Sequence, residues 1–279
     1  MTEDRMLVAL DGSRPAQSAA MIGLWLARAM NLSVQALYIV EAAEVEDPYA
    51  ERGPEMTAGR SVRSPGEAVA LDEEYGQGVL DEFILAAEAL NLEVTAEIDF
   101  GGVIPLLEQT AQGSRLVVLG KNGQDHQDDP GVLGTNFKSL LGLIDQPLLI
   151  GGNLLARSFD RILLAYDGGD AAGDAIEWAA ALRKNLENLH VDILAVEEGE
   201  ADANWAEEWL QEALAAFPDQ GQPPQAFAHR GDAGHEIRAA ADEHDSDLIV
   251  MGRPAHLLSG APGRTLLHVL QGGHTILLP

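Results

Sequence analysis

The sequence predicts an α/β fold made of two tandem domains, each with a five-stranded, parallel, doubly wound sheet flanked by helices. Two observations support this prediction: the chain of 279 residues contains an internal repeat, and in each half short apolar segments alternate with amphipathic, helix-like segments. Near-continuous apolar strands joined by helices are typical of a parallel sheet that is covered on both faces. In such sheets, ligands bind beyond the carboxyl ends of the strands, where the strand order reverses.

The two copies of the repeat begin in the same way. An apolar run at 6–10 ends in Asp11 and Gly12, and an apolar run at 162–166 ends in Asp167 and a glycine. A helical pattern follows each run, so each copy begins with a strand, a turn and a helix.

The remaining elements follow in chain order, and a later strand in each copy ends on a glycine, Gly120 or Gly252. The strands expected in the first half are 5–10, 33–40, 93–98, 115–120 and 147–151, and the helices include 16–30 and 104–112. The strands expected in the second half include 162–166, 247–252 and 275–278, and the helices include 171–185 and 236–244.

The two copies differ in length. We expect domains at 1–152 and 158–279, and the first carries extra residues at about 42–78, where prolines, glycines and charges gather. This composition is typical of a loop of low order. It indicates either a surface insertion or a lid over the ligand site.

The composition excludes several functions. Acidic side chains number 45 against 17 basic ones, which gives a formal net charge of −28, and cysteine is absent. Such a charge repels phosphate backbones and anionic lipid heads, so we expect neither nucleic-acid nor membrane-surface binding. Without cysteine there is no disulfide, thiolate nucleophile or Cys-ligated zinc. Ordinary solubility or a salt-rich cytoplasm would each explain an acidity that is spread over both halves.

The amino terminus and the apolar stretches indicate a cytoplasmic protein. Charged residues precede the first strand and leave no apolar signal segment, and the stretch at 140–155 is interrupted by Asp145 and by glycines. A helix that spans a bilayer needs about 20 apolar residues.

A glycine motif follows the fourth strand of the first copy. Gly120 and Gly123 are followed, after an acidic stretch, by Gly134 and Thr135 at the start of a helix. Glycines let main-chain amides approach a phosphate, and a helix amino terminus supplies unpaired N–H donors. Asp11, at the neighbouring strand end, can accept hydrogen bonds from a ribose hydroxyl or an adenine amine. The alternative is that the glycines are turns and that Asp11 belongs to a turn or a helix cap.

These residues resemble the universal stress protein family in its tandem form. The resemblance rests on the Asp-Gly-Ser start, on residues 37–41, on residues 248–252 and on the glycine motif, whose family form is Gly, two residues, Gly, nine residues, Gly, then Ser or Thr. It implies a Rossmann-like stress-response protein that binds ATP or AMP, sometimes with Mg²⁺ or Mn²⁺. It also implies that nucleotide is held in the first half by Asp11, Gly12, Ser13, Ile39, Val40, Gly120, Asn122, Gly123, Gly134, Thr135 and Asn136.

The first copy departs from the family motif in one respect. The segment between Gly123 and Gly134 is one residue longer and contains Asp125, Asp128 and Asp129. These carboxylates would repel a triphosphate or recruit Mg²⁺, which prefers oxygen ligands; the alternative is a solvated loop. Lys121 is the nearby cation that could offset this repulsion.

The second copy departs further. Ala255 replaces the second glycine, Pro254 has no N–H to donate, and Arg264 stands where Ser or Thr is expected. Arg253 and Arg264 could still attract phosphate by charge. We therefore expect a weaker second site, formed by Asp167, Val196, Gly252 and Gly263.

The motifs favour binding over catalysis, because no general base, nucleophile or dedicated metal cage accompanies the glycine loop. We expect a nucleotide-binding regulatory module, with the first half holding nucleotide, the second mainly structural, and at most slow ATP hydrolysis. The alternative is a nucleotide-free scaffold for dimerisation or docking. The two halves are expected to pair within one chain, and a homodimer is left open.

Overall fold

The computed structural model describes residues 4–41, 65–156, 158–186, 188–198, 205–217, 222–254 and 263–279. The elements of the first half are β1 (Arg5–Leu10), α1 (Arg14–Met30), β2 (Ser33–Val40), α2 (Pro65–Glu88), β3 (Val94–Phe100), α3 (Val103–Ala111), β4 (Leu116–Gly120), the 3₁₀ helix η2 (Gln124–His126), α4 (Thr135–Leu143) and β5 (Leu148–Gly151). Those of the second half are β6 (Arg161–Ala165), α5 (Asp170–Asn185), β7 (His190–Glu197), α6 (Trp205–Ala215), β8 (Gln225–Arg230), α7 (Ala233–Glu243), β9 (Leu248–Met251), α8 (Arg264–Leu270) and β10 (Thr275–Leu278).

Both halves have the predicted parallel, doubly wound sheet. The strand order is β3-β2-β1-β4-β5 in the first half and β8-β7-β6-β9-β10 in the second. The first strand of each half pairs in parallel with two neighbours, β1 with β2 and β4, and β6 with β7 and β9. The order therefore reverses beside β1 and beside β6, and a ligand crevice is expected at the carboxyl ends of these strands.

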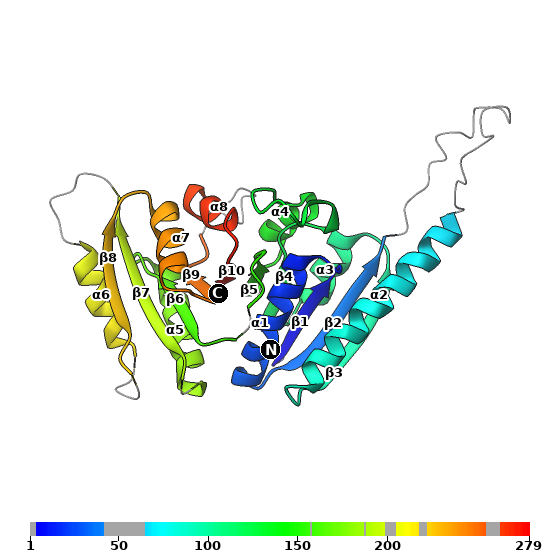
Figure 1. The fold of residues 1–279 in the computed structure, drawn as a ribbon, viewed down its shortest axis with the longest axis horizontal. Coiled ribbons are helices and arrows are strands. Elements are labelled where there is room, and N and C mark those ends of the chain that lie inside the picture. The colour runs from blue at the N-terminus through cyan, green and yellow to red at the C-terminus, as the bar shows by residue number, and fades with distance from the viewer. Residues whose placement is uncertain are drawn as a thin grey trace, which may run out of the picture.

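The two sheets join into one ten-stranded sheet (Figure 1). At the seam, β5 and β10 pair antiparallel, with Leu149 opposite Leu277 and Ile150 opposite Ile276. The prediction that the halves pair within the chain did not include this continuous sheet. The apolar pattern of β5 and β10 identifies each of them as a strand, but it does not indicate that they pair with each other.

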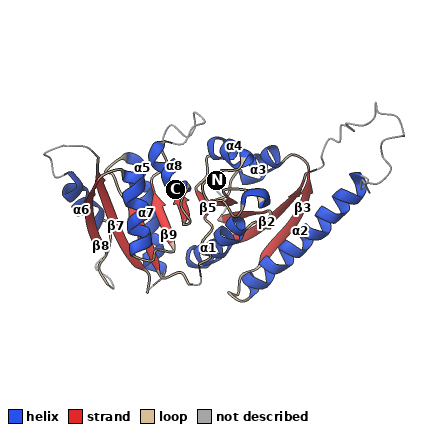
Figure 2. Cartoon of the chain, turned by 45° about the horizontal axis from the view of Figure 1, so that its top comes forward, coloured by secondary structure: helices blue, strands red, loops and turns tan. Residues whose placement is uncertain are grey.

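Alternate strand residues contribute to two apolar cores, one on each face of the sheet. Met6 and Val8 pack with side chains of α1 and α2, whereas Leu7 packs with side chains of α3 and α4. The second half repeats the arrangement with α5 and α6 on the first face and α7 and α8 on the other. Helices thus cover both faces (Figure 2), as near-continuous apolar strands require.

The expectation of a low-order loop over 42–78 is wrong for its last part. Residues 65–78 belong to α2, a helix of 24 residues, while 42–64 lie outside the described residues. Pro65 starts the helix, where its missing N–H is tolerated. Gly76 fits because a Cβ there would collide with the Tyr38 ring. The proline and the glycine that indicated a loop in the sequence therefore start a helix and let it pack closely on Tyr38, respectively.

None of the helices within the described ranges has the length and apolar content that crossing a membrane requires.

Glycine is required where the chain passes from β5 into the second half. A Cβ on Gly152 would collide with the main-chain oxygens of Gly273 and His274, just before β10. We therefore predict that Gly152→Ala lowers the free energy of unfolding by about 1–3 kcal/mol, the usual range for overpacking.

The matched control is Gly173→Ala in α5, where an added Cβ would meet no atom outside the backbone of its own helix within 4 Å. This variant should gain roughly 0.5–1 kcal/mol from helix propensity. Urea unfolding of both variants measures the two values. Equal stability of the two variants would contradict the close approach at the seam.

Candidate functional site

The second half contains a cavity of about 800 Å³ at the carboxyl ends of β6, β7 and β9, the switch point of its sheet. All four residues of the expected weaker site line this cavity: Asp167, Val196, Gly252 and Gly263. They come from four separate loops or strands, so the predicted constellation is brought together by the topology. Cavities of about 300–1,000 Å³ hold small-molecule ligands.

The walls of the cavity are largely apolar and aromatic. Leu194, Ile237 and Met251 line it from the sheet and from α7, and Trp205 and Trp209 line it from α6. The two tryptophan rings lie 6.4 Å apart between centroids. A Cβ on Gly168, whose φ is +71°, would collide with the Trp209 indole, so the turn after β6 requires glycine for conformation and for space.

By themselves, the helical patterns around the tryptophans gave no indication of these aromatic walls. Trp205 and Trp209 are four residues apart and hence on one face of α6, which is the signal that could have identified a shared surface. Tyr166, at the end of β6, also lines the cavity. Burial raises the pKa of Tyr166, and the nearby Glu212 adds to the shift, so the phenol stays protonated.

Among the described residues, four carboxylates line the cavity: Asp167, Asp170, Glu197 and Glu198. Asp167 Oδ1 accepts a hydrogen bond from the Gly169 N–H (3.0 Å), and Glu198 Oε1 accepts one from the Ala233 N–H (3.0 Å). The hydrogen bond from Arg230 (2.8 Å) lowers the pKa of Glu197 and keeps this carboxyl ionised.

Two guanidinium groups line the same cavity, and each has carboxylate or carbonyl partners. Arg264 pairs with Asp232, and its Nη2 lies 4.0 Å from Glu198 Oε1. Asp232 also caps α7 by accepting from the His235 N–H, and this bond is the main cause that lowers the pKa of Asp232. Arg253, the second guanidinium, points across the seam.

Arg253 donates hydrogen bonds to carbonyl oxygens of the first half, those of Gln146 (3.0 Å), Leu141 (3.2 Å) and Ile144. Leu141 is in the last turn of α4, where unpaired carbonyls and the helix dipole favour a cation. Burial lowers the pKa of Arg253 from its ordinary value. The expectation that this charge is available to phosphates is therefore wrong.

Lys121 makes the corresponding contact in the opposite direction. Its side chain is 1 % exposed, and Nζ donates to the carbonyl oxygens of Leu270 (2.9 Å) and Gly272 (2.5 Å) at the end of α8. Lys121 is thus bound by main-chain oxygens of the other half rather than directed toward the glycine motif of its own. We call Lys121, Arg253 and their carbonyl partners the reciprocal clamp.

In the first half, the Asp-Gly-Ser segment forms a turn and a helix cap. Asp11 Oδ1 accepts from the Ser13 N–H (2.8 Å), and the Ser13 side chain caps α1 by accepting from the Ala16 N–H (3.3 Å). A Cβ on Gly12 would collide with Tyr75 of α2. Burial raises the pKa of Asp11, and the hydrogen bonds from Ser13 oppose the shift.

The loop after β4 lies against this turn. Gln124 Nε2 donates to the Asp11 carbonyl (2.5 Å), and Gln127 Oε1 accepts from the Arg14 N–H (3.3 Å). The buried Asn122 holds the loop itself, since its Nδ2 donates to the His126 (2.6 Å) and Asp129 (3.0 Å) carbonyls.

The structure brings most of the expected first-half residues together. A Cβ on Gly123 would lie 4.0 Å from Asp11 Oδ2, and one on Gly134 would lie 3.6 Å from the Gly123 nitrogen. Gly120 is needed because β4 approaches the Ala16 nitrogen of α1 closely. Thr135 and Asn136 are exposed at the start of α4. Ile39 is partly buried and packs with the core formed by α3 and α4. Val40 is fully buried in the core formed by α1 and α2.

The acidic segment does not form a metal site in the described part of the chain. Asp128 pairs with Arg14 (3.0 Å), and Asp129 Oδ1 accepts from the Gly131 N–H (3.0 Å). Among the described residues, no group of three or more His, Asp or Glu side chains could hold a metal ion. The side chain of Asp125 is not among the described residues, so the Mg²⁺ hypothesis, which includes it, stays a prediction.

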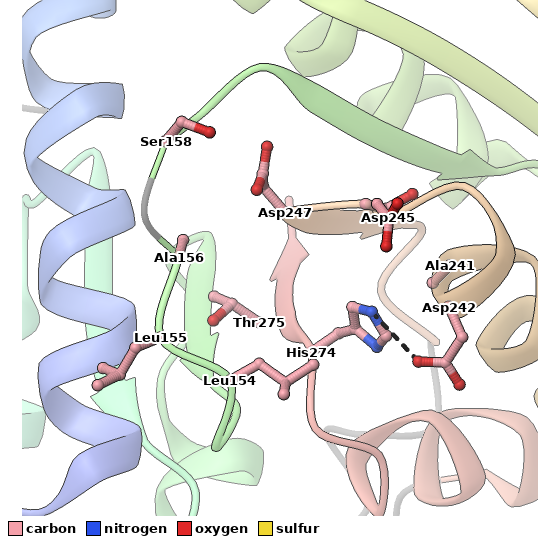
Figure 3. A pocket seen from close by; sticks show the side chains of 11 residues that line it. Leu154, Leu155, Ala156, Ser158, Ala241, Asp242, Asp245, Asp247, His274 and Thr275 are labelled. Carbon is pink, nitrogen blue, oxygen red and sulfur yellow. Dashed lines mark ion pairs between the residues drawn. The ribbon is translucent and has the colours of Figure 1, made fainter.

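A smaller cavity, of about 270 Å³, lies at the amino ends of β6, β9 and β10 (Figure 3). His274 and Asp242 line it, with Nε2 3.6 Å from Oδ1. Burial lowers the pKa of His274, although Asp242 opposes the shift. This edge is opposite to the one where ligands bind in doubly wound sheets, so we assign the cavity no part in the candidate site.

The fold and the site define a tandem α/β protein with a ligand-sized cavity at a switch point. The model of the universal stress protein family matches residues 3–150 and 158–271. The chain therefore belongs to the universal stress protein family, in its tandem, two-domain form.

Related proteins agree with this assignment. The universal stress protein Slr1230 of Synechocystis is 23 % identical over 267 residues, which cover 90 % of each chain. A universal stress protein structure from Archaeoglobus fulgidus has a TM-score of 0.70 at 16 % identity and covers 100 % of this chain and 97 % of its own. One from Pseudomonas aeruginosa, named as a putative universal stress protein, has a TM-score of 0.62 at 14 % identity and covers 99 % and 92 %. These structures share the fold.

The reciprocal clamp generates a prediction about pH. Burial lowers the pKa of Lys121 from 10.5 to about 8; Arg238 adds to the shift and Asp129 opposes it. Between these two values the unfolded chain binds a proton that the folded protein has released, so stability rises with pH in this window. Lys121→Met removes this contribution and leaves two carbonyls without a donor. The free energy of unfolding should fall by roughly 1–3 kcal/mol, and the difference from wild type should widen from about pH 8 to pH 10.5.

Urea unfolding across this pH range measures the difference. Lys138→Met, at an exposed lysine of α4, is the control and should leave the pH dependence unchanged. A difference between wild type and Lys121→Met that stays constant or narrows as the pH rises would contradict the buried lysine contact.

Proposed function

We propose that the protein binds an adenine nucleoside or nucleotide in the cavity of the second half and acts as a regulatory or binding module. One observation supports this most strongly: the cavity at the second switch point gathers Asp167, Val196, Gly252 and Gly263 around a space of about 800 Å³. Doubly wound sheets bind their ligands at this position. Membership of the universal stress protein family agrees with it.

Each part of such a ligand has a counterpart in the lining. The apolar side chains of Leu194, Val196 and Ile237 offer a wall for a flat base. Asp167 has oxygens that can accept from ribose hydroxyls. Gly263 lines the cavity at the start of α8, and Gly252 lines it where the missing Cβ lets β9 approach Ala171 of α5 closely.

The glycine motif alone favoured the first half as the principal site, and we now assign that role to the second half. At the first switch point, Gln124 donates to the Asp11 carbonyl, so the loop after β4 lies against the turn that would hold a ribose. We propose that the first half is the secondary site. For that half, the hydrogen bond from Gln124 to the Asp11 carbonyl and the packing of Tyr75 against Gly12 support the alternative of a nucleotide-free scaffold.

The lining of the cavity supports binding rather than fast turnover. Its described residues include carboxylates but no His, Cys, Ser or Lys that could pair as nucleophile and base. We propose a stress-response role in the cytoplasm, domains bounded at 1–152 and 158–279, and at most slow hydrolysis of bound ATP.

Calorimetric titration of the purified protein with adenosine, AMP and ATP tests this function. Asp167→Ala should weaken binding of the ligand that binds best by at least tenfold, or about 1.4 kcal/mol, because it removes the ribose acceptor. The matched control is Asp11→Ala, the corresponding change in the first half, which should leave the affinity within about twofold.

Two results would contradict the proposal. The first is that wild type binds no adenine compound at millimolar concentration. The second is that Asp11→Ala abolishes binding while Asp167→Ala leaves it intact, which would return the principal site to the first half.

A further inference from the structure

We propose that the second-half cavity is selective for the unphosphorylated nucleoside, so that affinity falls from adenosine to AMP and again to ATP. This inference rests on the proposed function and goes beyond it by naming the chemical class of the ligand. It is carried by the charges that line the cavity and by the partners that those charges already have.

Negative charge dominates the lining. Asp167, Asp170, Glu197 and Glu198 are set against two guanidinium groups. Glu197 is the one carboxylate of these that pairs with a cation outside the lining, Arg230. A ligand that carries phosphates is therefore repelled where an uncharged ligand is not.

Both guanidinium groups among the described lining residues already have partners. Arg253 donates to three carbonyl oxygens at the end of α4, as part of the reciprocal clamp. Arg264 is paired with Asp232 and approached by Glu198. To hold a phosphate, Arg253 would have to leave its carbonyl partners, whereas the charge of Arg264 is already compensated by Asp232 and Glu198.

The main chain at this end of the cavity is also a poor phosphate ligand. Pro254 follows Arg253 in the lining and has no N–H to donate, whereas the first copy has Asn122 at the same place. The rest of the lining suits an uncharged nucleoside, with apolar walls for the base and a carboxylate for the hydroxyls. Among the described residues, the cavity therefore keeps the groups that suit a nucleoside, while Pro254 and the partnered arginines offer little to a phosphate.

Two isosteric variants isolate the charges. Asp232→Asn keeps the cap on α7, because asparagine caps as well as aspartate, and removes the partner charge of Arg264. Glu198→Gln keeps an oxygen that can accept from the Ala233 N–H and removes a carboxylate beside Arg264. Asp174→Asn, on the exposed face of α5 and outside the cavity lining, is the matched control.

The experiment is calorimetric titration of wild type and the three variants with adenosine, AMP and ATP, in EDTA, at low and at high salt. Wild type should bind ATP at least tenfold more weakly than adenosine at low salt, and high salt should reduce this ratio by screening. Asp232→Asn and Glu198→Gln should each reduce the ratio at least threefold with little change for adenosine. Asp174→Asn should leave the ratio as in wild type.

ATP binding as tight as or tighter than adenosine in wild type would overturn this inference and leave the proposed function intact. A ratio that neither charge variant changes would also overturn it. Failure of adenosine, AMP and ATP alike to bind would remove the proposed function, and this inference with it.

Discussion

The pairing of β5 with β10 joins the two halves and sets where their cations lie. Antiparallel pairing at Leu149 and Leu277 places the end of β4 beside α8 of the second half, and the end of β9 beside α4 of the first half. Lys121 and Arg253, which each follow the glycine that ends such a strand, then meet helix carbonyls across the seam. Each of these cations therefore binds main-chain carbonyls of the opposite half. It does not face a phosphate position in its own half.

Much of this could be predicted from the sequence, and the rest depends on contacts between distant residues. Strands such as β1 and β9 are apolar runs that end in a turn signal, so local pattern is enough, and the strand topology brings Asp167 and Gly252 to one cavity. Lys121 could not be placed, because its partners are about 150 residues away and nothing local indicates them. Pro65 and Gly76 indicated a loop until the packing of α2 on Tyr38 was known.

The comparison of the two switch points separates a motif from a site. The first half has the more complete glycine motif, yet Gln124 bonds to the Asp11 carbonyl and Tyr75 packs over Gly12. The second half has lost a glycine to Ala255, yet its cavity is lined by Asp167 and its neighbours. A glycine motif indicates which main-chain conformations and close approaches are possible. The space for a ligand depends also on the side chains that the crossing helix and the following loop contribute.

The net charge of −28 also disfavours the binding of an anionic ligand. A phosphate site in an acidic protein needs a local excess of donors or cations to overcome the surrounding field. Here Lys121 and Arg253 bind main-chain carbonyls across the seam, and Arg264 pairs with Asp232, which caps the start of α7. Because the same cations cannot both hold the halves together and compensate a polyphosphate, the structure favours a ligand that brings little charge of its own.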